Sequence, residues 1–226
     1  MTSIHQNIFW FLTSIREHNN REFFALVKPL YVEIQDNLVD RANICMSQLH
    51  KNLWINYGDM NWKDCVFRIY RDARRIKEGQ LIYKENFAMM ICPNGKNDLK
   101  ANWFYLHIQS GGSFLAWWLY MPDPIDLTKV RKFLSVNGPK YHKIISNPEF
   151  LATFGSVTWD KLVRVPKWFE ESNKYIDIIK MKQFLVQKSY TDEEVLSEDF
   201  MDKFVNDCKI AKPFLNFLNQ WCEYDW

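Results

Sequence analysis

Residues 103–120 read WFYLHIQSGGSFLAWWLY, and this stretch indicates the fold class. Two runs rich in aromatic and branched residues, Trp103–Ile108 and Phe114–Tyr120, flank the pair Gly111-Gly112. Such residues are typical of strands, and two glycines between two strand-like runs indicate a tight hairpin. The stretch therefore predicts two antiparallel strands of one sheet.

More strands are expected on either side of this hairpin. Val66–Tyr70 and Phe87–Cys92 are short runs of the same kind, and Pro93-Asn94-Gly95 supplies a turn after the second run. The alternation of Val163 and Val165 and the run Phe184–Lys188 are candidates for later strands. Because consecutive hairpins make neighbouring strands antiparallel, we predict a central antiparallel sheet of about five strands.

The N-terminal part is predicted to be helical. Ile8 to Ile15 carries apolar residues at helical spacing. Asn20 is a natural N-cap, because its side-chain oxygen can accept a hydrogen bond from a free backbone N–H of a second helix that runs toward Leu53. Pro29 should kink that second helix or shift its start.

Helices are expected again after the hairpin. Asp126 is predicted to cap a helix that Gly138 stops. Asn147-Pro148 should open another helix, with proline at the first helical position, and Gly155 should stop it. Both segments use residue types that are typical of helix ends.

The C-terminal part should also be helical. Thr191 and Glu194 match a capping box, and Phe200–Leu218 predicts a last helix that Pro213 interrupts. Strands in the middle and helices from both the N- and C-terminal parts indicate the α+β class. No linker or internal repeat is visible, so residues 1–226 are expected to form a single domain.

The composition is that of a globular protein rich in aromatic residues. Of 226 residues, 47% are apolar and 16% are aromatic. The longest apolar run, Phe114–Met121, has eight residues, whereas a membrane span needs about 20. The N-terminus lacks a signal-peptide pattern, and the five cysteines form no CxxC pair. We therefore expect a cytoplasmic protein with no membrane attachment, disulfide framework, metal or cofactor.

The charges are unevenly distributed. The net charge of +2 disfavours a protein that wraps duplex nucleic acid. Residues 68–84, however, hold six Lys or Arg against two Asp or Glu, whereas residues 190–226 hold nine acidic residues against three lysines. The cationic segment is the best candidate for a site.

Several guanidinium groups can converge at this segment. On a strand, Arg68 and Tyr70 point to one face, and Asp72 can orient a nearby arginine. Guanidinium groups bind carboxylate or phosphate through two parallel hydrogen bonds. The lead hypothesis is a binding protein with a pocket for a small anionic ligand that bears phosphate or carboxylate. Its predicted contacts are Arg68, Arg71, Asp72, Arg74, Tyr83 and Lys84, assisted by Arg21, Lys28 and Tyr31.

Alternatives to this pocket stay open. The arginines can instead form an internal salt-bridge network with Asp72 and Glu78. An enzyme that acts on a phosphorylated substrate is a second hypothesis, with Asp72, Tyr83 and His107 as candidate acids or bases, although a buried and hydrogen-bonded role suits His107 better. No nucleotide-binding loop, zinc-protease motif or nucleophile elbow occurs. A protein–protein interaction module is the third hypothesis, motivated by the acidic C-terminal segment and the aromatic content.

Four short segments resemble a known family. They are NNREFF at Asn19–Phe24, FRIYRDAR at Phe67–Arg74, YKENF at Tyr83–Phe87 and DEE at Asp192–Glu194. Together they resemble domain-of-unknown-function family 2461, an uncharacterised conserved family of bacteria and fungi, over most of the chain. The resemblance implies a compact α+β fold and points again to the arginine segment, and it implies no activity.

The chain also departs from the family pattern. After Arg74 it lacks the proline that the family carries before its Tyr-Lys pair, and Trp117-Trp118 stands where the family has small glycines. Pro166–Phe169 reads PKWF where the family has PKGF. These replacements predict a diverged member whose pocket is filled or rewired.

Overall fold

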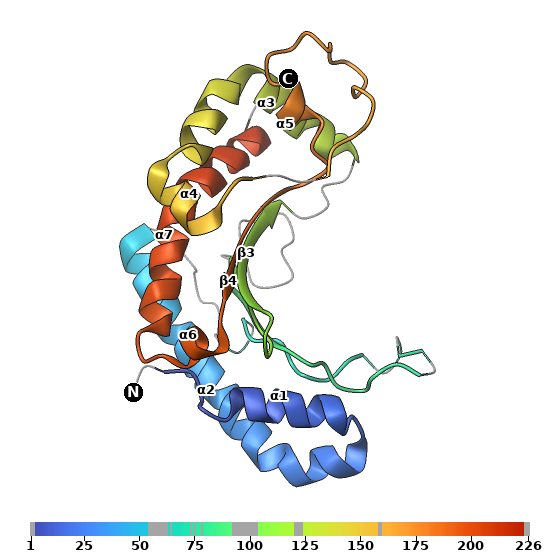
Figure 1. Cartoon of the computed structure of the whole chain (residues 1–226), viewed down its shortest axis with the longest axis vertical. Coiled ribbons are helices and arrows are strands. Elements are labelled where there is room, and N and C mark those ends of the chain that lie inside the picture. The colour runs from blue at the N-terminus through green and yellow to red at the C-terminus, as the bar shows by residue number, and fades with distance from the viewer. Residues whose placement is uncertain are drawn as a thin grey trace. The chain divides into compact units, whose positions relative to one another are not determined.

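The fold joins one antiparallel sheet to seven α-helices among the residues placed by the computed structural model, which are 3–53, 63, 65–72, 74, 76–77, 79–91, 104–119, 124–157 and 160–223 (Figure 1). In chain order the elements are α1 (Ile8–Glu17), α2 (Arg21–Leu53), β1 (Phe87–Ile91), β2 (Phe104–Ile108), β3 (Ser113–Leu119), α3 (Pro124–Ile145), α4 (Pro148–Phe154), α5 (Ile176–Ile179), β4 (Phe184–Tyr190), α6 (Asp192–Leu196), α7 (Phe200–Asn219) and the 3-10 helix η3 (Gln220–Glu223). The α+β class is confirmed.

The sheet has the strand order β1-β2-β3-β4, so the described residues form four strands and not about five. β1 pairs antiparallel with β2 from Phe87↔Ile108 to Ile91↔Phe104, and β2 pairs antiparallel with β3. The hairpin predicted at Gly111-Gly112 is confirmed. The N–H of Gly112 donates to the carbonyl of Gln109 at 2.9 Å, and Gly111 has a φ of 66°, a left-handed conformation that favours glycine.

Two predicted strands are absent from this sheet. Val66–Tyr70 makes only isolated bridges, Val66↔Met89 and Tyr70↔Tyr83. The segment around Val163 is not a strand either, because its side chain is 93% exposed and buries little apolar area. Pro166, three residues further along, has no backbone N–H to donate to a neighbouring strand.

The chain divides into two compact units, Met1–Ala116 with Ser189–Asn206 and Trp117–Lys188 with Asp207–Trp226. Each unit is discontinuous in sequence, since each takes a second segment from the C-terminal part. The single domain expected for residues 1–226 stays a prediction. The predicted turn at Pro93-Asn94-Gly95 also stays a prediction, because these residues lie outside the described part of the chain. The same is true of the strand ends predicted at Cys92, Trp103 and Tyr120 and of the salt-bridge role of Glu78.

In the first unit, α1 and α2 pack together and α2 packs against β1. The N-cap predicted at Asn20 is confirmed, because its Oδ1 accepts from the N–H of Phe23 at 2.8 Å. α2 begins directly afterwards and continues through Pro29. Its buried residues recur every three or four positions from Tyr31 to Leu49, so one continuous face is available for packing.

The short helix α6 holds the tip of the β2–β3 hairpin. The capping box is confirmed, with the Thr191 hydroxyl accepting from the N–H of Glu194 at 3.2 Å and the Glu194 carboxylate accepting from the N–H of Thr191 at 2.8 Å. The Asp192 carboxylate accepts from the Ser110 hydroxyl at 3.0 Å and from the N–H of Gly111 at 2.9 Å. One carboxylate therefore fixes the turn.

In the second unit, α3 is longer than predicted. It begins at Pro124, so Asp126 lies in the first turn and does not cap the helix, and it continues through Gly138 and Pro139. Gly138 is needed for packing, because a Cβ there would overlap the ring of Tyr175. The helix end predicted at Gly138 is therefore wrong, and the glycine instead allows the Tyr175 ring to pack closely against α3.

Polar contacts complete the second unit. The Asn147 cap of α4 and its end at Gly155 are confirmed. The buried Arg131 guanidinium donates to the carbonyls of Ile179 at 2.8 Å and Met181 at 3.2 Å, which ties α3 to the end of α5 and to the residues that precede β4. Pro213 lies inside α7, which is therefore continuous and not interrupted as predicted.

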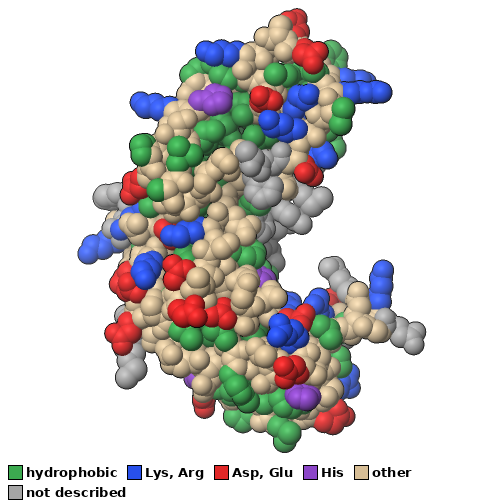
Figure 2. All heavy atoms as spheres, in the orientation of Figure 1, with side chains coloured by type: hydrophobic (Ala, Val, Ile, Leu, Met, Phe, Trp, Pro, Cys, Tyr) green, Lys and Arg blue, Asp and Glu red, His purple; other side chains and the backbone are tan. Residues whose placement is uncertain are grey.

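The surface does not separate the charges into large regions of one sign on the face drawn in Figure 2, where Lys and Arg are interspersed with Asp and Glu. Among the described helices, none combines the length and the apolar character required to cross a membrane.

Gly138→Ala should lower the free energy of unfolding by about 1–3 kcal/mol, because the added methyl group overpacks the contact with Tyr175. In a helix without this contact the same change would raise stability. Chemical denaturation measures the effect. Gly112→Ala is the matched control, since its Cβ would meet Gln109 at 3.8 Å, an ordinary contact. A Gly138→Ala protein as stable as the native one would contradict the packing role.

Candidate functional site

The arginine segment is held by backbone hydrogen bonds on two sides. The N–H of Phe67 donates to the carbonyl of Ala88 in β1 at 2.9 Å. On the other side, the N–H of Lys84 donates to the carbonyl of Ile69 at 2.8 Å, and that of Arg71 donates to Ile82 at 3.2 Å. This double attachment fixes the direction of each side chain. Ile69 is buried, whereas Arg68 and Tyr70 are exposed.

Arg68 and Tyr70 line a hollow that α2 closes on one side. The volume of the hollow is about 460 Å³, which lies within the range of small-molecule sites. Tyr31 contributes the aromatic contact with Tyr70, with ring centroids 5.9 Å apart in an edge-on arrangement. The other lining residues are Gln35, Asp36, Val39, Lys63 and Val66.

The electrostatics of the hollow centre on Tyr31 and Arg68. Burial is the main influence on the Tyr31 hydroxyl and raises its pKa, while a hydrogen bond from the backbone of Ile69 and the charge of Arg68 act in the opposite direction. Among the residues that the structure describes, the Arg68 guanidinium makes no ion pair. The Oε1 atom of Gln35 is buried and accepts no hydrogen bond from any residue that the structure describes.

The predicted contacts Asp72 and Arg74 pair with each other instead of lining the hollow. The Asp72 carboxylate accepts from Nε of Arg74 at 3.0 Å and from Nη2 at 2.8 Å, a two-point ion pair. The Arg74 side chain is 88% exposed. Asp72 thus orients an arginine, as proposed, but this pair fits the salt-bridge alternative.

Lys84 and Tyr83 contact the arginine segment and the rings packed against it. The Lys84 ammonium donates to the carbonyl of Arg68 at 2.9 Å and lies 5.4 Å from the centre of the Phe67 ring. The Tyr83 ring is buried and stacks on Phe24, with centroids 4.3 Å apart. Both residues therefore position the backbone and rings around the hollow without lining it.

Three of the predicted assisting or contacting residues lie elsewhere on the surface. Arg21, Lys28 and Arg71 are exposed, and none of them lines the hollow. Of the residues predicted from the sequence, only Arg68 and Tyr31 share it. Gln35 and Val39 were missed, although they follow Tyr31 at intervals of four residues and so lie on the same helix face.

The candidate base His107 is hydrogen-bonded at both ring nitrogens. Nε2 lies 2.9 Å from Oε1 of Gln109, and Nδ1 lies 3.2 Å from the Tyr105 hydroxyl and 3.3 Å from Nδ2 of Asn86. Oε1 of Gln109 only accepts, so Nε2 carries the proton and Nδ1 is an acceptor for two donors. This network suits a neutral structural histidine.

Comparison with protein families shows which family the chain matches. The model of the family described as Conserved hypothetical protein (DUF2461) matches residues 7–217, which is most of the chain. The chain belongs to the DUF2461 family. Comparisons with curated proteins and with solved structures give no significant match.

The four DUF2461 segments recognised in the sequence all belong to the first unit, and three of them are joined by hydrogen bonds. Asn19 pairs with the backbone of Tyr83 in both directions, donating from Nδ2 to the carbonyl at 3.2 Å and accepting at Oδ1 from the N–H at 2.9 Å. The paired asparagines therefore have separate structural roles, since Asn20 caps α2. Asp192 anchors the hairpin.

Asn19→Ala should lower the free energy of unfolding by about 1–3 kcal/mol, because it leaves two backbone groups of Tyr83 without partners. Asn20→Ala removes one capping bond and should cost about 1 kcal/mol. Urea denaturation of both variants gives the comparison. A larger loss of unfolding free energy for Asn20→Ala than for Asn19→Ala would contradict the greater structural role given to Asn19.

His107 should titrate below its ordinary pKa of 6.5, because burial lowers its pKa more than the bond to Gln109 raises it. The unfolded chain then takes up the proton first. The stability that neutral His107 provides is complete above pH 6.5 and is lost as the pH falls through the window between 6.5 and the lowered value. NMR titration of the ring measures this pKa directly, and a value at or above 6.5 would refute the neutral network.

Proposed function

We propose that this DUF2461 protein binds a small anionic ligand in the hollow between α2 and residues 66–70, with the ligand's phosphate or carboxylate on Arg68. The observation that carries the proposal is the guanidinium of Arg68, which lines a hollow of about 460 Å³ beside the Tyr31 hydroxyl and has no ion pair within the described residues. Arg74, in contrast, already has its carboxylate in Asp72.

The charges of the lining residues favour an anion. Arg68 and Lys63 are cationic, and Asp36 is the one acidic residue among the described lining residues. A guanidinium offers two parallel N–H donors that match a carboxylate or phosphate. Hydroxyl groups of Tyr31 and Tyr70 add hydrogen-bond donors to the lining of the hollow.

The buried Oε1 of Gln35 narrows the ligand further. A buried acceptor without a partner costs about 1–3 kcal/mol. Because this oxygen is shielded from solvent, the amide must turn toward the hollow before a ligand N–H or O–H can bond to it and remove that cost. Gln35 lies on the α2 wall of the same hollow. We therefore infer a ligand with an anionic group at one end and a hydrogen-bond donor at the other, such as a hydroxy acid, an amino acid or a sugar phosphate.

The proposal includes no reaction. The acids and bases that the sequence suggested are committed elsewhere, because Asp72 pairs with Arg74 and His107 is bonded at both ring nitrogens. Burial raises the pKa of Tyr83, which makes its phenol a weaker acid. None of the three lines the hollow, so binding is the function that the geometry supports best.

A thermal-shift panel of hydroxy acids, amino acids, sugar phosphates and inorganic phosphate tests the proposal. A ligand present at about 100 times its dissociation constant adds roughly 2.7 kcal/mol of stability. Arg68→Ala should weaken binding by about ten- to a hundredfold, because it removes charge-assisted hydrogen bonds. Gln35→Leu should weaken only those ligands that carry a donor.

Arg74→Ala is the matched control, because it removes the same charge from an exposed residue that lies outside the hollow. Binding that survives Arg68→Ala but is lost in Arg71→Ala or Arg74→Ala would place the anion at Arg71 or Arg74, outside the hollow. Absence of any shift across the panel would favour the internal salt-bridge alternative and direct the search to a protein partner.

A further inference from the structure

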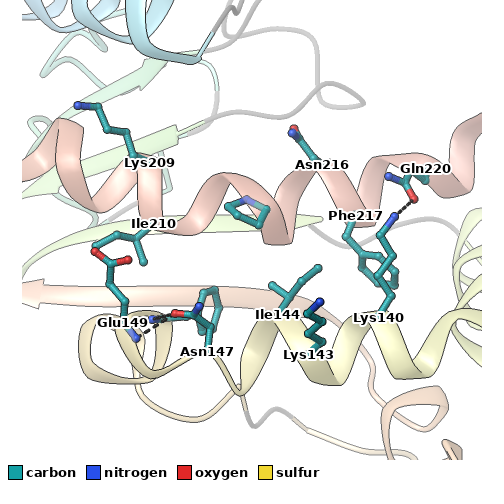
Figure 3. A pocket seen from close by; sticks show the side chains of 12 residues that line it. Lys140, Lys143, Ile144, Asn147, Glu149, Lys209, Ile210, Asn216, Phe217 and Gln220 are labelled. Atoms are coloured by element: carbon teal, nitrogen blue, oxygen red, sulfur yellow. Dashed lines mark hydrogen bonds between the residues drawn. The ribbon is translucent and has the colours of Figure 1, made fainter.

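A second hollow lies wholly within the other unit, between α7 and the neighbouring helices α3 and α4 (Figure 3). Its volume is about 530 Å³, which is again in the range of small-molecule sites. Ile144 from α3 and Ile210 from α7 point into the space between the helices. No sequence motif predicts this hollow, since its lining comes from segments more than 50 residues apart.

The floor of this groove is apolar and held in place by packing. Phe150 is 2% exposed and Phe217 is 1% exposed, so both rings are almost completely covered by other parts of the protein. Their rings contact other core rings, with Phe150 5.8 Å from Phe214 and Phe217 5.1 Å from Phe133, measured between ring centroids. The floor is therefore a preformed, recessed surface.

Two lysines one helical turn apart on α3 stand over this floor. Lys140 donates to Oε1 of Gln220 at 2.9 Å and lies 5.8 Å from the centre of the Phe217 ring, so its side chain crosses the groove from α3 to η3. Lys143 is exposed and makes no hydrogen bond or ion pair within the described residues. Lys209 also belongs to the lining, but its side chain points away in Figure 3.

The acidic residue of the groove lies apart from these lysines. Glu149, the one acid among the described lining residues, extends from α4 toward Ile210, whereas Lys140 and Lys143 occupy the other part of the groove (Figure 3). The groove thus offers an unpaired cation at one place and a recessed apolar floor beside it. A ligand that matches both must join an anion to an apolar body.

We propose that this groove binds a free amphiphilic carboxylate of the fatty-acid type, with its carboxylate on Lys143 and its hydrocarbon chain along Phe150, Ile210 and Phe217. The floor residues are recessed and cannot insert into a bilayer, so the apolar part must come from the ligand. The site is separate from the Arg68 hollow, shares no residue with it and does not depend on the function proposed there.

Calorimetry with hexanoate, octanoate and decanoate, each below its micellar concentration, tests the site in the full chain. Each buried methylene should tighten binding by about fourfold. 1-Decanol, which has the same chain without the charge, should bind at least tenfold more weakly than decanoate, because it cannot use Lys143.

Variants identify the carboxylate contact. Lys143→Glu should weaken decanoate binding by tenfold or more, and Lys143→Arg should preserve it, since the positive charge remains. Lys167→Glu makes the same charge change at an exposed residue outside the groove and should leave binding unchanged. Arg68→Ala should have no effect either, which separates this test from that of the other hollow.

Four outcomes would overturn the proposal. They are no binding of any of the three acids, equal binding of decanol and decanoate, an equal loss in Lys143→Glu and Lys167→Glu, or binding only to vesicles of anionic lipid. The last result would mean that the lysines contact a membrane surface.

Discussion

Backbone hydrogen bonds on both flanks of residues 65–71 are the constraint on which the first unit depends. A segment bonded to β1 on one side and to residues 82–84 on the other cannot rotate, so the exposure of Arg68 and the burial of Ile69 follow from the alternation of an extended chain. The pairing of Asn19 with Tyr83 attaches the connection between α1 and α2 to the same segment. The position of the Arg68 guanidinium is thus set by backbone hydrogen bonds, which do not depend on the charge of the side chain.

Much of the local structure was predictable because it follows from the nearest residues. Caps at Asn20, Asn147 and Thr191 form as expected, since a side chain and an amide two or three positions away suffice to make them. The Gly111 turn is equally local. The breaks predicted at Gly138 and Pro213 were wrong, because both residues lie within continuous helices. At Gly138 the glycine makes room for the ring of Tyr175, a partner that is distant in sequence.

The candidate site was predicted only in part, and the reason is physical. A run of arginines has the same sequence signature whether its members face a hollow or a carboxylate, and the two cases coexist here in Arg68 and Arg74. The walls supplied by Gln35 and by Lys63 come from other segments, so their contribution depends on tertiary contacts. The groove of the second unit carries no motif at all, because its floor consists of ordinary core phenylalanines.

The discontinuity of the first unit has a consequence for how the protein is made. Residues 1–116 do not complete it, because Asp192 holds the hairpin tip and Leu196 accepts from Gln6 across 190 positions of sequence. During synthesis these partners emerge only after residues 117–188 of the other unit have left the ribosome. The N-terminal segment must therefore wait with an unfinished surface, and contacts of such long sequence separation are slow to form. The first unit can therefore be completed only after residues 189–206 have been translated, close to the end of synthesis.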